Sequence, residues 1–164
     1  MQLTTPLNIF QLRKSNLQGK SSMHNLYHEE ILKHAKSPEF TSKIKKVDAS
    51  GYAVNQFCGD EVTVDLSFSD GVINDVYINS TGCSINIASS SLMAGEIKHL
   101  DPKQVSTLIN AYKSLMTGKT LESNDENKIG SLDVMESVKA FPIRIKCALL
   151  GTQAVEDAVS RLTI

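Results

Sequence analysis

Residues 61–68 read Glu-Val-Thr-Val-Asp-Leu-Ser-Phe, and apolar and polar side chains alternate along this stretch without interruption. Successive side chains of a β-strand point to opposite faces, so the pattern predicts a strand with one buried face. Residues 69–71 read Ser-Asp-Gly, a turn sequence whose Asp-Gly pair accommodates positive φ angles, and residues 72–79 alternate again. The sequence therefore predicts an antiparallel hairpin, to which residues 51–57 add a less regular third strand.

Helical patterns occur both before and after this hairpin in the sequence. The strongest follows Asp101, a capping residue with proline next and glutamine three positions later, and ends at Gly118. Apolar spacing of three and four residues predicts further helices at 22–36, 84–97, 132–139 and 143–162. The expected fold is α+β: a small antiparallel sheet of about three strands, packed against helices on one face.

Composition excludes several classes of protein. The chain has 164 residues, a formal net charge of −1 and 21% charged residues, which fits one globular domain and lacks the basic surface of a nucleic-acid-binding protein. The longest apolar run, at 147–151, is far shorter than the roughly 20 residues that span a bilayer. We therefore expect neither nucleic acid nor a membrane as a partner.

The first 22 residues differ from the rest of the chain. They contain no Asp or Glu, three basic residues and many Ser, Thr and Gln side chains. We interpret residues 1–22 as a flexible N-terminal extension and residues 23–164 as the domain.

Three cysteines, Cys58, Cys83 and Cys147, make an odd number in a chain without a secretory signal. A disulfide framework is therefore not expected, and the predicted location is the reducing cytoplasm. Each cysteine falls at the end of a predicted element, and Asp60 lies two positions after Cys58. Three thiolates and one carboxylate would complete a tetrahedral zinc shell, although scattered cysteines are also common as small buried residues.

Three segments carry a resemblance to a known family. Residues 55–60 read Asn-Gln-Phe-Cys-Gly-Asp, residues 82–85 read Gly-Cys-Ser-Ile ahead of Ala-Ser-Ser-Ser-Leu-Met at 88–93, and residues 141–147 read Phe-Pro-Ile-Arg-Ile-Lys-Cys. In this order they resemble the NifU/IscU-like proteins of iron-sulfur cluster assembly, over about residues 24–160. The resemblance implies the SufE/NifU-like fold.

Within that family the zinc-dependent SufU branch is the more similar. The scaffold branch is known for a His directly before its last cysteine, where this chain has Lys146, and 64 positions separate Cys83 from Cys147, as in SufU-like members. The first motif departs from the family, which usually has Pro where this chain has Gln56-Phe57. That change puts the rigidity of the loop before Cys58 in doubt.

The SufU resemblance implies a persulfide carrier of the sulfurtransferase type. Cys58 would accept sulfur from a pyridoxal-phosphate cysteine desulfurase, with zinc held by Cys58, Asp60, Cys83 and Cys147, and would pass it to a downstream iron-sulfur assembly scaffold. Arg144 matches an arginine that contacts the desulfurase. The alternative is a noncatalytic scaffold on which a [2Fe-2S] cluster, or iron, is held by the same three cysteines and aspartate, because soft thiolates serve either metal centre.

Overall fold

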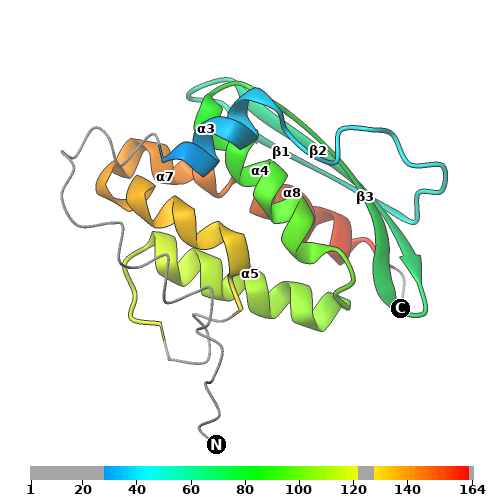
Figure 1. Ribbon diagram of the computed structural model, residues 1–164. Helices are drawn as coiled ribbons and strands as arrows, with labels where there is room; N and C mark the ends of the chain where they lie inside the picture. Colours follow the sequence, from blue (N-terminus) through cyan, green and yellow to red (C-terminus); the bar gives the residue numbers. More distant parts are fainter. Residues whose placement is uncertain (1–27, 122–127, 163–164) are drawn as a thin grey trace, which may run out of the picture.

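The computed structural model describes residues 28–121 and 128–162. Within them lie one antiparallel sheet of strand order β1-β2-β3, five α-helices and one 3-10 helix. The elements in chain order are α3 (Glu29–Lys36), β1 (Ala49–Asn55), β2 (Asp60–Ser69), β3 (Val72–Thr81), α4 (Ser84–Ile97), α5 (Pro102–Met116), η1 (Gly130–Ala140), α7 (Pro142–Ala148) and α8 (Leu150–Ser160). The helices gather on one side of the sheet (Figure 1), which confirms the predicted α+β architecture.

The predicted hairpin is β2 and β3. Val62, Val64 and Leu66 of β2 are fully buried against the helices, and burial of each such side chain contributes about 1.5–3 kcal/mol. Asp70 and Gly71 form the tip with φ angles of 53° and 80°, as the Asp-Gly pair predicts. This hairpin supplies the central and one outer strand of the sheet.

The alternation expected along residues 72–79 is wrong in one respect. Ser67 pairs with Asp75 and Phe68 pairs with Ile73, so β3 has one extra residue, Asn74, at this point. A β-bulge of this kind shifts the facing pattern by one position. As a result Ile73 and Val76, three residues apart, both point into the core.

Strand β1 begins and ends two residues earlier than predicted. It begins at Ala49, which pairs with Leu66, and it ends at Asn55 because residues 56 and 57 belong to the turn that leads into β2. Within β1 lies Gly51, whose missing side chain lets α8 approach: a Cβ there would lie 2.9 Å from Cβ of Ala158. This close approach joins α8 to the sheet.

Two helix predictions need correction. The capping box at Asp101 and Gln104 is present, but the segment predicted as a helix at 132–139 is the 3-10 helix η1. The helix expected over 143–162 is two helices separated at Leu149, where φ is −95° and ψ is −3°. Both helices contact α4, but α7 also packs against η1 whereas α8 packs mainly against β1 and β2, so a single straight helix could not make both sets of contacts.

Several expectations fall outside the described residues. These are the extension at 1–22, the domain boundary at Met23 and the first turns of the helix predicted from residue 22, of which α3 is the described part. Among the described residues, no helix combines the length and apolar character needed to cross a membrane.

Candidate metal centre

Cys58 lies in the four-residue turn between β1 and β2. Asn55 shapes this turn: its carbonyl oxygen accepts hydrogen bonds from the N–H groups of Cys58 (3.3 Å) and Gly59 (2.9 Å), and its side-chain oxygen accepts one from Phe57 N–H (3.2 Å). Gly59 takes the positive φ of 70° that closes the turn. The turn holds the Cys58 thiol at the surface, exposed to solvent.

Asp60 begins β2 directly after this turn and is only 1% exposed. Its carboxylate accepts hydrogen bonds from the N–H of Cys83 (2.9 Å) and from the Cys83 thiol (3.3 Å). Gly82 makes this contact possible, because its φ is 116° and a Cβ at that position would collide with the Asp60 carboxylate. Asp60 and Cys83, 23 residues apart, are thus fixed against each other at one end of the sheet.

Cys147 reaches the same place from the penultimate position of α7, rather than from the opening turns of the predicted long helix. It is 2% exposed, and its sulfur lies 3.9 Å from the sulfur of Cys58. The ligand atoms of Cys58, Asp60 and Cys147 all lie within 4.8 Å of one another. These side chains therefore gather at one end of the sheet.

Cys83 joins this group through Asp60. Its thiol contacts the aspartate carboxylate, while the group of mutually close ligand atoms consists of the other three residues. In a tetrahedral zinc site with Zn–S bonds of about 2.3 Å, two sulfurs lie about 3.8 Å apart, and a sulfur and an oxygen about 3.6 Å apart. The separations of 3.9 Å between the Cys58 and Cys147 sulfurs and 3.3 Å between Cys83 and Asp60 are close to these values, so the donor set fits a metal.

Within this group the pKa values of Asp60 and Cys147 are shifted in opposite directions. Burial tends to raise the pKa of Asp60, but the N–H of Cys83 and the neighbouring thiols outweigh it and hold this pKa below its ordinary value. Burial, followed by the Asp60 carboxylate, raises the pKa of the Cys147 thiol well above its ordinary value. Without a metal, Asp60 is therefore ionised and Cys147 is protonated at neutral pH.

Exposed cationic and apolar side chains lie on the turn and the helix that carry Cys58 and Cys147. The thiolate form of Cys83, and to a smaller extent that of Cys147, would raise the pKa of the exposed Arg144. The Lys146 ammonium lies 5.2 Å from the centre of the Phe57 ring, so this residue contacts the turn rather than the ligand group. Phe57 is 93% exposed and Ile143 is 84% exposed, which is unusual for side chains of this size.

Sequence reasoning identified the four ligand candidates and Arg144 but missed the residues that support them. Asn55 and Gly82 belong to the motifs, but the motifs do not indicate that Asn55 forms the turn or that Gly82 admits the Asp60 carboxylate. A glycine directly before a cysteine at the end of a strand is the signal that could have indicated the close approach.

Comparison with known proteins agrees with this class of structure, an α+β domain with cysteines and an aspartate gathered at one sheet end. The chain belongs to the family of the NifU-like N terminal domain, whose model matches residues 26–148. The family predicted from the three motifs is confirmed.

The chain is similar to two functionally named bacterial relatives. It is 31% identical to the iron-sulfur cluster assembly scaffold protein IscU of Thermotoga maritima, covering 84% of this chain and 95% of the relative. It is 29% identical to the zinc-dependent sulfurtransferase SufU of Bacillus subtilis, covering 86% and 94%. Among solved structures it resembles FiSufU of Fervidobacterium islandicum, with a TM-score of 0.76, 31% identity and coverage of 83% and 98%. The relatives thus carry both the scaffold and the sulfurtransferase names.

Proposed function

We propose that this protein is a zinc-dependent sulfur acceptor that takes persulfide sulfur from a cysteine desulfurase and passes it to a downstream iron-sulfur assembly scaffold. The observation that carries the proposal is the contrast between Cys58, exposed at the tip of a turn, and its buried neighbours Asp60 and Cys147. An exposed thiol can meet a sulfur donor on another protein, whereas a buried one cannot. The similarity to the zinc-dependent sulfurtransferase SufU supports this assignment.

Cys58, Asp60, Cys83 and Cys147 are the proposed zinc ligands. Zinc bound there supplies a redox-inert positive charge that favours the thiolate forms. Asp60 contributes a carboxylate that is already ionised, because its pKa lies below the ordinary value. Cys147 gives up a proton whose loss is otherwise unfavourable, since its pKa is raised by burial. Zinc binding at neutral pH is therefore expected to release protons to solvent.

Cys58 performs the proposed sulfur transfer. Its thiolate attacks the terminal sulfur of the desulfurase persulfide, so that one S–S bond forms as the original S–S bond breaks. The desulfurase cysteine leaves as a thiolate and Cys58 carries the persulfide, with no net oxidation or reduction. The position of Cys58 in a four-residue turn gives the incoming sulfur access from solvent.

Arg144 is proposed to contact the desulfurase. Its side chain is exposed, and its pKa is raised by the thiolate forms of Cys83 and Cys147. It is therefore placed to counter the negative charge of the thiolates and to meet an acidic or carbonyl group of a docked partner.

The scaffold function remains the second candidate, because the chain is equally similar to proteins named IscU and thiolates also hold [2Fe-2S] clusters. Lys146 argues against it. Where the scaffold branch has its additional His, this chain has an ammonium group directed over Phe57, and a protonated amine cannot ligate a metal.

The experiment that tests the proposal incubates the zinc-loaded protein with a cysteine desulfurase and cysteine, then locates sulfur by mass spectrometry. A persulfide on Cys58 and faster desulfurase turnover are expected, and both should be lost in Cys58→Ala. Arg144→Ala should weaken the stimulation, whereas Arg161→Ala, which removes an exposed arginine paired with Asp157, should not. Appearance of a cluster with iron and acid-labile sulfide, without persulfide on Cys58, would support the scaffold function instead.

A further inference from the structure

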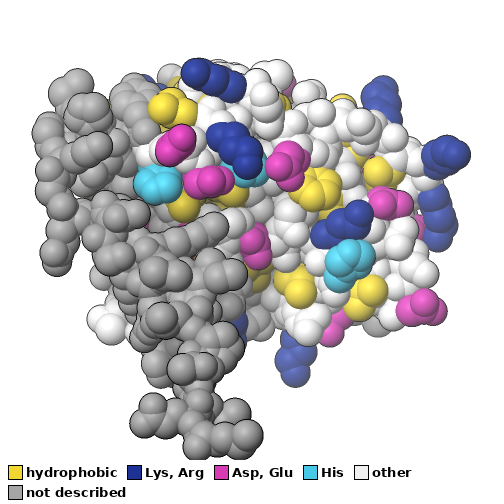
Figure 2. Space-filling model, viewed as in Figure 1, with side chains coloured by type: hydrophobic (Ala, Val, Ile, Leu, Met, Phe, Trp, Pro, Cys, Tyr) yellow, Lys and Arg dark blue, Asp and Glu magenta, His cyan; other side chains and the backbone are white. Residues whose placement is uncertain are grey.

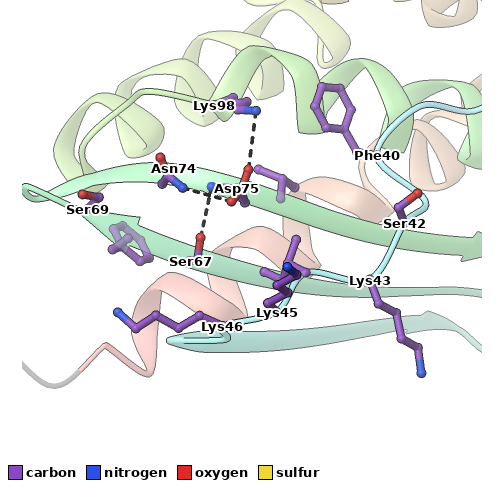
Figure 3. A pocket seen from close by; sticks show the side chains of 13 residues that line it. Phe40, Ser42, Lys43, Lys45, Lys46, Ser67, Ser69, Asn74, Asp75 and Lys98 are labelled. Atoms are coloured by element: carbon purple, nitrogen blue, oxygen red, sulfur yellow. Dashed lines mark hydrogen bonds and ion pairs between the residues drawn. The ribbon is translucent and has the colours of Figure 1, made fainter.

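A groove lies at the opposite end of the sheet from the cysteines. It has a volume of about 670 Å³ and separates the irregular segment 37–48 from the tip of the β2–β3 hairpin (Figure 3). Ser67 on its floor is seven residues along β2 from Asp60, which corresponds to about 23 Å at 3.3 Å per residue. The groove is therefore distinct from the candidate metal centre and shares no residue with its proposed ligands.

Lysines dominate the charged lining of this groove. The lining contains a single carboxylate, that of Asp75, and four lysines: Lys43, Lys45, Lys46 and Lys98. Asp75 already contacts Lys98 at 3.6 Å and the Asn74 amide at 2.9 Å. Lys46 pairs with Asp48 at 3.0 Å, whereas neither Lys43 nor Lys45 forms an ion pair with any residue that the structure describes. The groove therefore has an unbalanced positive charge.

Figure 2 shows the same imbalance on the molecular surface. Lysine and arginine side chains gather at the right-hand edge of that view, where segment 37–48 projects in Figure 1. The whole chain, in contrast, is nearly neutral, with a formal charge of −1. The positive charge is thus a local feature of this end of the sheet.

Hydrogen-bonding groups for an extended chain are also present. The carbonyl of Leu66 accepts a hydrogen bond from Asp48 N–H (2.8 Å), so the backbone groups of Leu66 point toward β1 and not toward β3. Val76 of β3 pairs with Leu66, and its own backbone groups must therefore point away from β2, toward the outer edge of β3. Phe40 covers this edge at Ile78, and Leu100 covers it at Ile73, but no described backbone group pairs with Val76 between them.

Ser67 adds a side-chain donor at the same place. Its register puts it on the face of the sheet opposite the core, yet it is only 5% exposed. Its hydroxyl oxygen accepts from Asp75 N–H (3.1 Å), which leaves the hydroxyl proton to donate. Apolar side chains of Phe40 and Ile44 line the groove beside these polar groups.

We propose that this groove binds an acidic, extended segment of a partner protein. In Figure 3, Lys98 points to Asp75 while Lys43 and Lys46 extend in different directions, so the ammonium groups do not converge on one point as a single phosphate would require. Spaced cations beside an unpaired strand position instead match carboxylates on alternate residues of an extended chain. The first 22 residues of this chain do not match, since they contain no Asp or Glu.

The test uses the full-length, zinc-loaded, ¹⁵N-labelled protein and a blocked peptide of alternating Glu and Val. Peptide binding should shift the amide signals of Ser67, Asp75 and Val76. The double variant Lys43→Glu/Lys45→Glu should weaken binding by about tenfold or more, as expected for two lost and reversed surface charge contacts. The matched control Lys103→Glu/Lys119→Glu makes the same charge change at exposed positions outside the groove and should retain binding.

Three results would overturn the proposal. The first is no shift of these amides at millimolar peptide. The second is equal weakening by the control variant, which would indicate attraction by net charge alone. The third is that inorganic phosphate shifts the same amides with an affinity equal to that of the peptide, which would make the groove a small-anion site.

Discussion

Cys58 and Cys147 are the same residue type with sulfurs 3.9 Å apart, but their surroundings give them different chemistry. Cys58 is exposed in a turn, whereas Cys147 is 2% exposed at the end of α7 and has a raised pKa. The first thiol is accessible to another protein, and the second has only its neighbours in the site as partners. Position in the fold, not residue identity, is therefore the reason for proposing Cys58 as the acceptor.

This difference predicts different costs of removing each thiol. Without metal, Cys58→Ala should change the free energy of unfolding by no more than about 0.5 kcal/mol, as for other exposed positions. Cys147→Ala should cost about 1 kcal/mol or more, because it removes a buried atom from the core. Urea denaturation checks both values, and elemental analysis should find zinc retention impaired in both variants. Equal stability losses would contradict the assigned burial of the two thiols.

The shifted pKa values predict how pH affects the metal-free protein. The folded-state pKa of Cys147 is raised, so the stability that its protonated thiol contributes is complete below the unfolded-state pKa of about 8.5 and is lost as pH rises above it. The folded-state pKa of Asp60 is lowered, so its contribution is present above about 3.9 and is lost on acidification.

Thermal melts of the metal-free protein between about pH 7 and 9.5, below the ordinary tyrosine pKa of about 10, measure the alkaline part of this effect. Stability should fall over that interval in the parent chain and fall less in Cys147→Ala. Zinc should remove the dependence, because a ligated thiolate has no proton to lose. An unchanged slope in Cys147→Ala would assign the effect to another group.

At the level of elements, two strand ends, one turn and one helix end form the site. The junction of β3 and α4 is the most constrained of these, since Gly82 combines a φ of 116° with direct contact to Asp60. Gly82→Ala should therefore destabilise the protein by about 1–3 kcal/mol and reduce zinc retention. Gly118→Ala is the matched control: its φ is also positive, 73°, but a Cβ there meets open space. Zinc retention that is equally impaired in the control would contradict the role of Gly82.

A second glycine, Gly51, allows the contact between β1 and α8 to be tested. Gly51→Ala would place a methyl group against the Ala154 carbonyl and the Ala158 side chain, and overpacking of this kind costs about 1–3 kcal/mol. Denaturant unfolding should show this loss. Metal content should stay at one zinc per chain, because Gly51 lies away from the ligand group; loss of zinc would mean that β1 transmits strain to the turn at Cys58.

The sequence predicted the elements whose local signals are strong. Strand β2, the Asp-Gly turn and the capping box of α5 each follow from alternation or from fixed residue types. The bulge at Asn74 and the separation of α7 from α8 at Leu149 could not be predicted in this way, because tertiary packing decides them. A period of three and four residues continues through Leu149 even though α7 packs against η1 and α8 packs against the sheet.

The site could be predicted only in part. Spacing alone left the cysteines open to interpretation as buried filler, and the resemblance of three motifs identified the ligand candidates together. The exposure of Phe57 and Ile143 and the contact between Lys146 and Phe57 had no sequence signal, since the same residue types are usually buried or simply solvated.

Across the whole molecule, the proposed ligands come from positions 58 to 147 and connect the β1–β2 turn, the β3–α4 junction and α7. A metal that binds only the folded state stabilises it by about 2.7 kcal/mol when its concentration is 100 times the dissociation constant. Treatment with a strong chelator should therefore lower the melting temperature, and zinc should restore it. A melting temperature that is indifferent to both would argue against a metal bridging these segments.

The central claim, that three thiolates and one carboxylate hold a single zinc ion, is tested most directly by zinc X-ray absorption spectroscopy with elemental analysis, on protein purified without added metal. We predict one zinc per chain with three sulfur ligands at about 2.3 Å and one oxygen ligand at about 2.0–2.2 Å. Iron with acid-labile sulfide, or zinc surrounded by nitrogen and oxygen ligands alone, would contradict the account.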